Sequence, residues 1–240
     1  EKIIMLSHTK VAADELRDAI LKLPEMIERG LRKKFFKYKI CTIHAFCRSK
    51  LLKKELISYA DYLNLCAENS GFKAQRTTPS EFNNSKHKFF KFLNDAFGQG
   101  KTIKEHWNSL RETSSIYHPY NNFRMITEMK EVYDNYKKVN QMCDYDDMIA
   151  DFINNAVDPD IDVLIVDEAQ DSNVPQLQAL KKMSTNVKEY YMVGDADQTI
   201  FEFSGANADY FHKLSKDAQQ LEQGFRCGET INSLCKEIIQ

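Results

Sequence analysis

The sequence predicts an α/β fold, a parallel sheet with helices on both faces, together with an all-helical insertion. Short apolar runs rich in Ile and Val, typical of buried strands, lie near both ends of the 240-residue chain. Amphipathic segments with helical spacing alternate with these runs, as in parallel sheets that helices cover. Between them, residues 57–139 contain no convincing strand, which favours a helical insertion there.

The predicted elements follow in chain order. We expect strands at residues 2–6, 39–43, 162–166 and 190–193. We expect helices at residues 9–23, 45–56, 86–97, 123–139 and 174–183. The last of these carries Pro175 in its first turn, where a missing N–H costs nothing. The chain then divides into three segments: 1–56 and 140–240 are the two parts of the α/β domain, and 57–139 are the insertion.

Composition excludes several classes of protein. The chain has 33 basic and 35 acidic side chains, a formal charge of −2, and 42% apolar residues, which excludes a disordered chain. No run approaches the roughly 18 apolar residues that a membrane-spanning helix needs, and the first residues do not form a signal peptide. The six cysteines form no CxxC pair, which favours reduced thiols over a disulfide or zinc framework. We therefore expect a cytoplasmic protein with no membrane partner.

Charge is balanced in total but unevenly distributed. Residues 29–54 contain ten basic side chains and no acid, whereas residues 144–171 contain ten acids and no Lys or Arg. A solvated face is the simplest interpretation of such runs. The basic run flanks a predicted strand, however, and clustered Lys and Arg favour binding to a polyanion because they displace counterions from phosphates. The acidic run is compatible with a divalent metal site.

The strongest motif is DVLIVDEAQD, residues 162–171, in which an apolar strand ends in two acids. This order places both carboxylates at the carboxyl edge of a parallel sheet, where open α/β folds bind ligands. Asp167 suits a Mg²⁺ ion, which prefers few carboxylates and keeps several waters. Glu168, one residue further, is free to take a proton from an attacking water. The structural alternative is a strand followed by an acidic helix cap.

Two later segments add polar groups suited to phosphate chemistry. In VGDADQTIFEFSGA, residues 193–206, Asp195 and Gln198 again follow a predicted strand. The Gln198 amide can donate to a phosphate oxygen and accept from water, so it suits a γ-phosphate sensor. In LEQGFRCGETI, from residue 221, the planar fork of Arg226 matches phosphate geometry.

Three earlier segments, IIMLSHTKVAADEL, CTIHAFC and CDYDDMI, complete a set that resembles the superfamily 1A DNA helicases, the UvrD/Rep/PcrA group. The resemblance covers nearly all of the chain and implies a RecA-like domain 1A of the P-loop NTPase type, with residues 57–139 as the 1B insertion. It implies an ATP-dependent DNA helicase or translocase that uses ATP and Mg²⁺ and moves 3′ to 5′ along single-stranded DNA. The alternatives are a motor that works with a nuclease in DNA repair or phage defence, and a helicase-like module that binds DNA without turnover.

The resemblance also implies roles for individual residues. Asp167 would hold Mg²⁺, Glu168 would be the catalytic base, and Gln198 would couple the γ-phosphate to the DNA-binding segments. Arg226 would contact the γ-phosphate, and Phe225 would stack near the adenine. The further nucleotide-binding candidates are Gln170 and Asp195. The candidates for contact with single-stranded DNA, and with junctions between single and double strands, are Ser7, His8, Thr9, Thr42, His44 and Phe203.

The chain departs from the family pattern at several points. His8 stands where the family usually has Phe, Phe225 where it usually has Tyr, and Ser204 where it often has Arg. No phosphate-binding GxxxxGK[ST] is present, because Asp95 stands where the segment 98–102, GQGKT, would need its first Gly. We therefore expect the chain to begin at motif Ia, without the first strand–loop–helix unit, and to be an incomplete part that is inactive alone.

Overall fold

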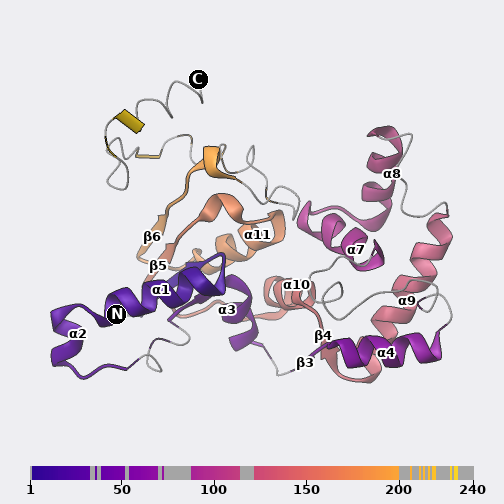
Figure 1. The fold of residues 1–240 in the computed structure, drawn as a ribbon, viewed down its shortest axis with the longest axis horizontal. Helices are drawn as coiled ribbons and strands as arrows, with labels where there is room; N and C mark the ends of the chain where they lie inside the picture. The colour runs from indigo at the N-terminus through magenta and orange to yellow at the C-terminus, as the bar shows by residue number, and fades with distance from the viewer. Residues whose placement is uncertain are drawn as a thin grey trace.

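The structure is a computed structural model in which two groups of elements meet near the middle of the molecule (Figure 1). One group contains a parallel sheet with its helices, and the other is built from helices. The residues that the structure describes are 2–32, 36, 39–51, 54–69, 72, 88–113, 122–199 and scattered single positions after 199.

The main sheet is parallel throughout and has the strand order β2-β1-β5-β6. Its strands are β1 (Ile3–Ser7), β2 (Ile40–Thr42), β5 (Val163–Val166) and β6 (Glu189–Met192). Each lies within about a residue of its predicted position, and β1, β2 and β5 supply buried side chains to the core. β6 pairs with β5, stands at one end of the four-strand order and exposes most of its side chains.

The register aligns the carboxyl ends of the strands along one edge of the sheet. Ser7 pairs with Thr42, and Leu6 pairs with Val166. Val166 in turn pairs with Met192. The residues that follow these strands therefore emerge along the same edge, and this is where the sequence places its candidate functional side chains.

The helices of the sheet group follow from capping signals and apolar spacing. They are α1 (Lys10–Leu21), α2 (Pro24–Glu28), α3 (Ile43–Ser49), α10 (Tyr145–Asn155) and α11 (Val174–Met183). Asn173 and Gln176 form a capping box that starts α11. The sheet and helices share one core, in which Leu6, Phe46 and Leu164 are almost fully buried.

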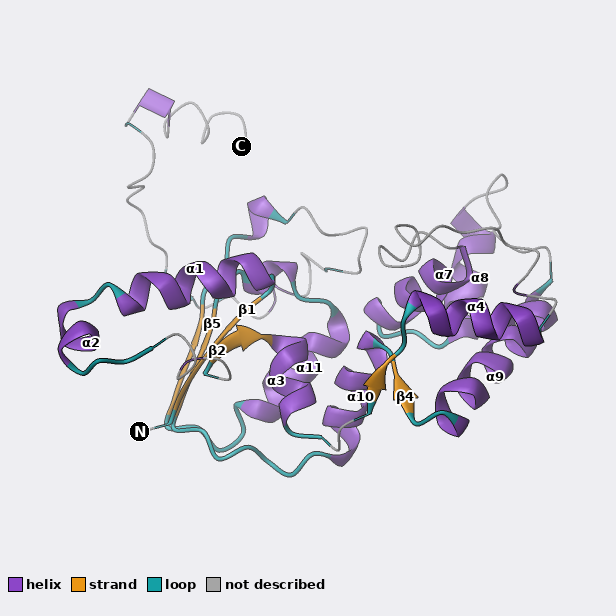
Figure 2. Ribbon diagram, turned by 60° about the horizontal axis from the view of Figure 1, so that its bottom comes forward, coloured by secondary structure: helices purple, strands orange, loops and turns teal. Residues whose placement is uncertain are grey.

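The predicted helix at residues 45–56 is wrong at its carboxyl end. α3 stops at Ser49, and residues 55–56 form the short strand β3 (Glu55–Leu56), which pairs in parallel with β4 (Met142–Cys143). The local apolar pattern is compatible with a longer helix, but pairing with a segment some 85 residues away overrides it. The β3–β4 pair joins the two groups of elements (Figure 2).

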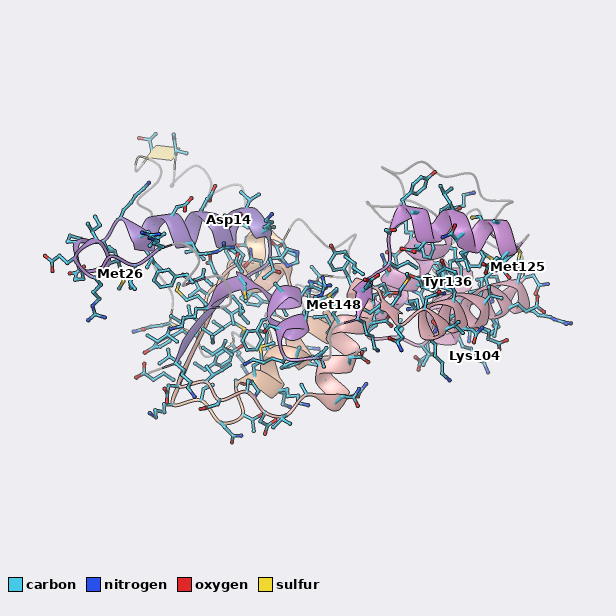
Figure 3. The ribbon with its side chains drawn as sticks, turned by 90° about the horizontal axis from the view of Figure 1, so that it is seen from below. Asp14, Met26, Lys104, Met125, Tyr136 and Met148 are labelled. Atoms are coloured by element: carbon cyan, nitrogen blue, oxygen red, sulfur yellow. The ribbon has the colours of Figure 1, made fainter. Side chains whose placement is uncertain are left out.

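The helical group has a separate, aromatic core. Its helices are α4 (Tyr59–Glu68), α7 (Lys88–Gly98), α8 (Ile103–Thr113) and α9 (Phe123–Val139). Phe89 and Phe90 both pack edge-on against Tyr133 at ring distances of 6.1 and 5.1 Å. No strand occurs among the described residues between 57 and 139. Figure 3 shows Tyr136 and Met125 in this group and Met148 of α10 near the junction with the sheet group.

The cysteines and the apolar character of the helices bear on the expectations drawn from composition. Cys41, Cys47, Cys66 and Cys143 are free thiols, as predicted, whereas Cys227 and Cys235 lie outside the described residues. Within the described helices, none combines the length and the apolar character needed to span a bilayer.

Candidate functional site

The candidate residues form two groups on the carboxyl edge of the sheet. The first group, at the ends of β5 and β6, contains Asp167, Glu168, Gln170, Asp195 and Gln198. The second group, at the ends of β1 and β2, contains Ser7, His8, Thr9, Thr42 and His44. Three further candidates, Phe203, Phe225 and Arg226, lie outside the described residues.

The two acids after β5 sit on a sharply turned backbone. The Asp167 N–H donates to the Leu6 carbonyl oxygen at 2.8 Å, which anchors the acid pair to β1. Glu168 adopts a left-handed conformation, φ 52° and ψ 46°, and leads into the 3₁₀ turn Ala169–Asp171. A non-glycine residue in this region costs on the order of 1 kcal/mol or more and is most often retained at functional sites. The backbone therefore marks Glu168 as a residue whose orientation matters.

Gln170 connects the ends of β5 and β6. Its side chain is buried, with 2% of its surface exposed. Its Nε2 donates to Glu168 Oε2 at 2.8 Å, and its Oε1 accepts from the Asp195 N–H at 3.1 Å. The amide thus orients the Glu168 carboxylate and fixes the loop after β6 at the same time. These contacts give Gln170 a positioning role, and its direct contact with a nucleotide stays a prediction.

Asp195 and Gln198 form an exposed polar pair on the loop after β6. Asp195 Oδ1 accepts from the Asp197 N–H at 3.1 Å and so caps the 3₁₀ turn Ala196–Gln198. Its Oδ2 accepts from Gln198 Nε2 at 2.6 Å. The pair therefore holds the Gln198 amide at the surface next to the Gln170 link, where a phosphate oxygen could replace Asp195 as its acceptor.

Gly194 allows the loop after β6 to lie close to the loop after β5. A Cβ atom at this position would lie 2.5 Å from Gln170 Oε1 and 2.8 Å from Phe211 Cζ. Both distances are shorter than van der Waals contact, so any larger residue would push the buried amide out of place.

The donor set after β5 is compatible with a magnesium–nucleotide site in which the protein supplies only one or two of the metal ligands. Among the described residues, no group of three or more His, Cys, Asp or Glu side chains is placed to hold a metal. Mg²⁺ in phosphoryl-transfer enzymes is commonly bound by one or two carboxylates together with waters and the substrate phosphates. Asp167, half-buried at the strand end, matches this donor set.

The second group presents hydroxyl and imidazole side chains. Thr9 and Thr42 are the N-caps of α1 and α3, and their Oγ1 atoms accept from Ala12 N and Ala45 N at 3.1 and 3.2 Å. Each hydroxyl still has its O–H to donate to a phosphate. Ser7 is 1% exposed, and its Oγ has no hydrogen-bond partner within the described structure. Contact of the Ser7 side chain with DNA stays a prediction.

The two histidines of this group are uncharged at neutral pH. Burial lowers the pKa of His8, and burial together with the neighbouring His8 lowers the pKa of His44 to about 4. The rings can therefore stack or form hydrogen bonds, but they add no positive charge to the site.

Tyr145 is a candidate that sequence reasoning missed. Its ring lies edge-on to His44, with ring centroids 5.5 Å apart, and the residue is 57% exposed at the start of α10. An exposed aromatic residue beside the DNA-contact candidates suits base stacking. In the sequence, Tyr145 is visible only as an aromatic residue just before the acid pair of CDYDDMI. Its position next to His44 becomes apparent only in the folded structure.

Several basic side chains of residues 29–54 form contacts with other groups of the protein. Lys54 Nζ lies 2.8 Å from Asp151 Oδ2, and Arg48 donates to the Lys54 carbonyl oxygen at 3.4 Å. Lys50 lies over the Phe46 ring, 5.2 Å from its centroid. A polyanion-binding surface in this run stays a prediction.

Comparison with known proteins agrees with this arrangement. Residues 1–219 match the UvrD/REP helicase N-terminal domain. The chain is 34% identical over 80 residues to the ATP-dependent DNA helicase PcrA of Staphylococcus aureus (strain NCTC 8325 / PS 47), a match that covers 31% of the chain and 11% of the relative. It is 39% identical over 61 residues to the ATP-dependent DNA helicase Rep of Buchnera aphidicola subsp. Baizongia pistaciae, covering 25% of the chain and 9% of the relative.

These matches span about a tenth of the relatives' length, whereas the family match covers most of the chain. The family match and the parallel sheet confirm both the predicted fold class and the predicted resemblance. The chain therefore belongs to the UvrD/Rep helicase family, with residues 1–219 matching the family's N-terminal domain.

Proposed function

We propose that this chain binds Mg-ATP and single-stranded DNA in an ATP-dependent DNA helicase or translocase that moves 3′ to 5′. The observation that carries the proposal is the buried Gln170 link, which ties Glu168 after β5 to Asp195 after β6. The link builds one polar surface at the strand ends, and the DNA-contact candidates follow the neighbouring strands on the same edge. Binding of nucleotide and DNA on one sheet edge gives a short path for coupling.

In this proposal the residues of the first group support ATP hydrolysis. Asp167 holds Mg²⁺, which neutralises charge on the phosphates when bound. Glu168 accepts a proton as water attacks the γ-phosphorus, while the bond from that phosphorus to the β–γ bridging oxygen breaks. Gln170 holds the Glu168 carboxylate in place, and Gln198 detects the γ-phosphate. Arg226 and Phe225 are proposed from the sequence pattern to contact the γ-phosphate and the adenine.

The second group supports binding of single-stranded DNA and of its junctions with duplex. In this proposal the Thr9 and Thr42 hydroxyls donate to phosphates, and the His44 and Tyr145 rings stack on bases. The N-cap positions of the two threonines and the edge-on contact of the two rings support it. Stacking tolerates any base, as movement along DNA requires. Phe203 is proposed from the sequence as a further stacking residue.

We also propose the domain division that the sequence suggested, with residues 1–56 and 140–240 as domain 1A and 57–139 as insertion 1B. Two separate cores support it. The buried members of the sheet core lie outside 57–139, and the buried members of the aromatic core lie inside it.

The test is ATP hydrolysis by the full protein with and without single-stranded oligonucleotide. We expect hydrolysis to rise when the oligonucleotide is added, and duplexes with a 3′ single-stranded tail to be separated in preference to those with a 5′ tail. DNA binding with no hydrolysis would instead identify a module that binds DNA without turnover. Equal hydrolysis with and without DNA would contradict the coupling.

Replacing Tyr145 with alanine tests the DNA surface. We expect Tyr145→Ala to weaken binding of single-stranded DNA by about 1–3 kcal/mol, because one stacking ring is lost. Tyr145→Phe keeps the ring and is expected to bind with nearly the original affinity. Fluorescence anisotropy with a labelled oligonucleotide measures both variants, and an unchanged affinity in Tyr145→Ala would remove this residue from the DNA surface.

A further inference from the structure

α7 contributes side chains to both hydrophobic cores of the molecule. Phe89, Phe90 and Phe92 lie in the aromatic core of the helical group. Phe97, on the last turn of the same helix, packs against the core of the sheet group. α7 also contacts α11, the helix that follows the acid pair (Figure 1). A shift of α7 relative to either group would therefore disturb its packing against the other.

The turn after α7 is formed by the segment GQGKT, residues 98–102, which does not meet the phosphate-binding pattern. The Gly100 N–H donates to the Phe97 carbonyl oxygen at 2.8 Å. The Lys101 N–H donates to the Ala96 carbonyl oxygen at 2.9 Å, which completes a Schellman motif. Gly100 adopts the left-handed conformation that this motif uses, with φ 64°. These two hydrogen bonds fix the direction in which the chain leaves α7.

Gly100 lies against Val174, the first residue of α11. A Cβ atom at position 100 would lie 2.8 Å from Val174 Cγ1 and 3.4 Å from Val174 Cβ. Carbon atoms pack best at about 3.5–4.0 Å, so an added methyl group would displace Val174 by roughly 1 Å. Valine in a helix has one strongly preferred rotamer, so its side chain has little freedom to turn aside. The turn after α7 is thus in direct contact with the start of α11.

A short hydrogen-bonded segment connects this contact to Glu168. The first turn of α11 is held by its capping box. Before the box, the Ser172 N–H donates to the Ala169 carbonyl oxygen at 3.1 Å. The Asp171 N–H donates to the Glu168 carbonyl oxygen at 3.2 Å. A displacement at the start of α11 is therefore passed along a compact turn to the residue that carries the carboxylate.

We propose that the turn after α7 positions Glu168, because its contact with Val174 holds the start of α11 and the turn that precedes it. Gly100 and Val174 are then positioning residues that act through Glu168. The inference rests on the proposed function for its effect on ATP hydrolysis, and it gives the helical insertion a part in that reaction.

Gly100→Ala tests the contact in the full protein. ATP hydrolysis is measured over a range of ATP concentrations with saturating single-stranded oligonucleotide. We expect kcat to fall by about tenfold or more, because a misplacement of about 1 Å can cost roughly 10²-fold in rate. We expect the affinity for a fluorescent ATP analogue to stay the same, because Glu168 acts on the attacking water.

Gly30→Ala is the matched control. Gly30 has nearly the same backbone conformation, φ 61°. Apart from its chain neighbours, no described residue has an atom within 4 Å of a Cβ atom at this position. Both alanines therefore strain the backbone to the same extent, but only the one at position 100 meets another helix. We expect Gly30→Ala to hydrolyse ATP at the original kcat.

Val174→Ala removes the Cγ atoms that a methyl group at position 100 would meet. In the double variant Gly100→Ala/Val174→Ala, the two Cβ atoms would lie 3.4 Å apart, which a small shift relieves. We expect the double variant to recover most of the lost kcat, so that the two changes are not additive. Val174→Ala alone leaves a gap in the contact and is expected to lower kcat by less than Gly100→Ala does.

Amide hydrogen exchange, followed by mass spectrometry, reports on the same contact without hydrolysis. We expect residues 168–174 to exchange faster in Gly100→Ala than in Gly30→Ala, because the turn that holds the Asp171 and Ser172 amides is displaced. The double variant is expected to restore slow exchange. If the unmodified protein hydrolyses no ATP, exchange decides the inference, and the two proposals fail or stand separately.

Three results would overturn the inference: an unaltered kcat in Gly100→Ala, a loss that Gly30→Ala shares, or a loss that the double variant does not reverse. The last two would attribute the effect to backbone strain instead of the contact. A thermal unfolding midpoint shows whether each variant is folded. If Gly100→Ala is not folded, Val174→Ala decides, and an original kcat together with original exchange in that variant would overturn the inference.

Discussion

Glu168→Gln in the full protein is expected to reduce DNA-stimulated ATP hydrolysis by about 10²- to 10⁴-fold, the usual contribution of a general base. Glutamine keeps the size of the side chain and can still accept the hydrogen bond from Gln170 Nε2, so the loops after β5 and β6 stay tied. What is lost is the carboxylate that takes the proton from water. A phosphate-release assay measures the rate, and binding of a fluorescent ATP analogue shows whether the nucleotide still binds.

Glu189→Gln is the matched control for this prediction. Glu189 begins β6 at the opposite, amino-terminal end of the strand and accepts from the Tyr191 hydroxyl at 2.6 Å. Its replacement removes the same charge from the same sheet and is expected to leave hydrolysis unchanged. Full turnover in Glu168→Gln would exclude this residue as the base.

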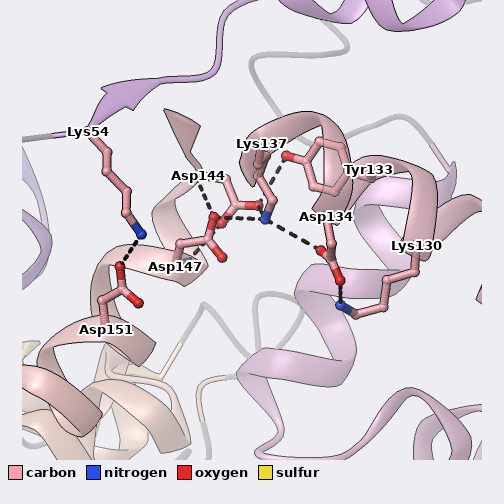
Figure 4. A network of polar contacts seen from close by, with 8 residues as sticks. All are labelled: Lys54, Lys130, Tyr133, Asp134, Lys137, Asp144, Asp147 and Asp151. Atoms are coloured by element: carbon pink, nitrogen blue, oxygen red, sulfur yellow. Dashed lines mark hydrogen bonds and ion pairs between the residues drawn. The ribbon is translucent and has the colours of Figure 1, made fainter. Parts of the chain in front are cut away.

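Lys137→Met is expected to lower the free energy of unfolding by about 3–5 kcal/mol, the typical cost of breaking a buried ion pair by removing one partner. Lys137 is 8% exposed, and its ammonium group lies between Asp144 and Asp147 and 4.4 Å from the centroid of the Tyr133 ring (Figure 4). Methionine keeps most of the volume but leaves the two carboxylates without their cation. Urea unfolding followed by circular dichroism measures the difference.

The pKa of Lys137 gives the sign of the pH dependence. Burial alone would lower this pKa, but Asp144 and Asp147 outweigh it, so the pKa in the folded protein is raised. The stabilisation by Lys137 is therefore fully present at pH 7, below the ordinary lysine pKa of about 10.4, and is lost only as pH rises through the raised value.

Two further variants control the Lys137 prediction. Lys138→Met changes the exposed neighbour in the same helix and is expected to alter stability by less than about 0.5 kcal/mol. Adding Asp144→Asn to Lys137→Met removes one unpaired carboxylate and keeps a good N-cap for α10, so part of the lost stability is expected to return. Equal stability of Lys137→Met and Lys138→Met would show that the buried pair is not stabilising.

Local sequence signals predicted the sheet and the placement of its polar groups. β1, β2 and β5 were predictable because their apolar runs contribute buried side chains, whereas β6 follows the same apolar pattern although most of its side chains are exposed. The positions of Asp167 and Asp195 followed because parallel strands end on one edge. The roles of these residues came from the family pattern and stay proposals.

Contacts between distant segments could not be read from the sequence. α3 ends early because Leu56 pairs with Cys143, and Tyr145 reaches His44 only through the packing of α10 on α3. The burial of Gln170 also depends on the loop after β6, which lies 25 residues further along the chain. Apolar periodicity and residue propensity describe only the local segment, so they do not reveal which distant segment it will contact.

β6 ends the four-strand order on one side, and its pairing within the described residues is with β5 alone. Backbone N–H and C=O groups on the outer side of such a strand need water or another strand as a partner. Tyr190 and Tyr191 of this strand are 39% and 51% exposed. The outer border of β6 is thus a template onto which one more strand, from this polypeptide or another, could be added.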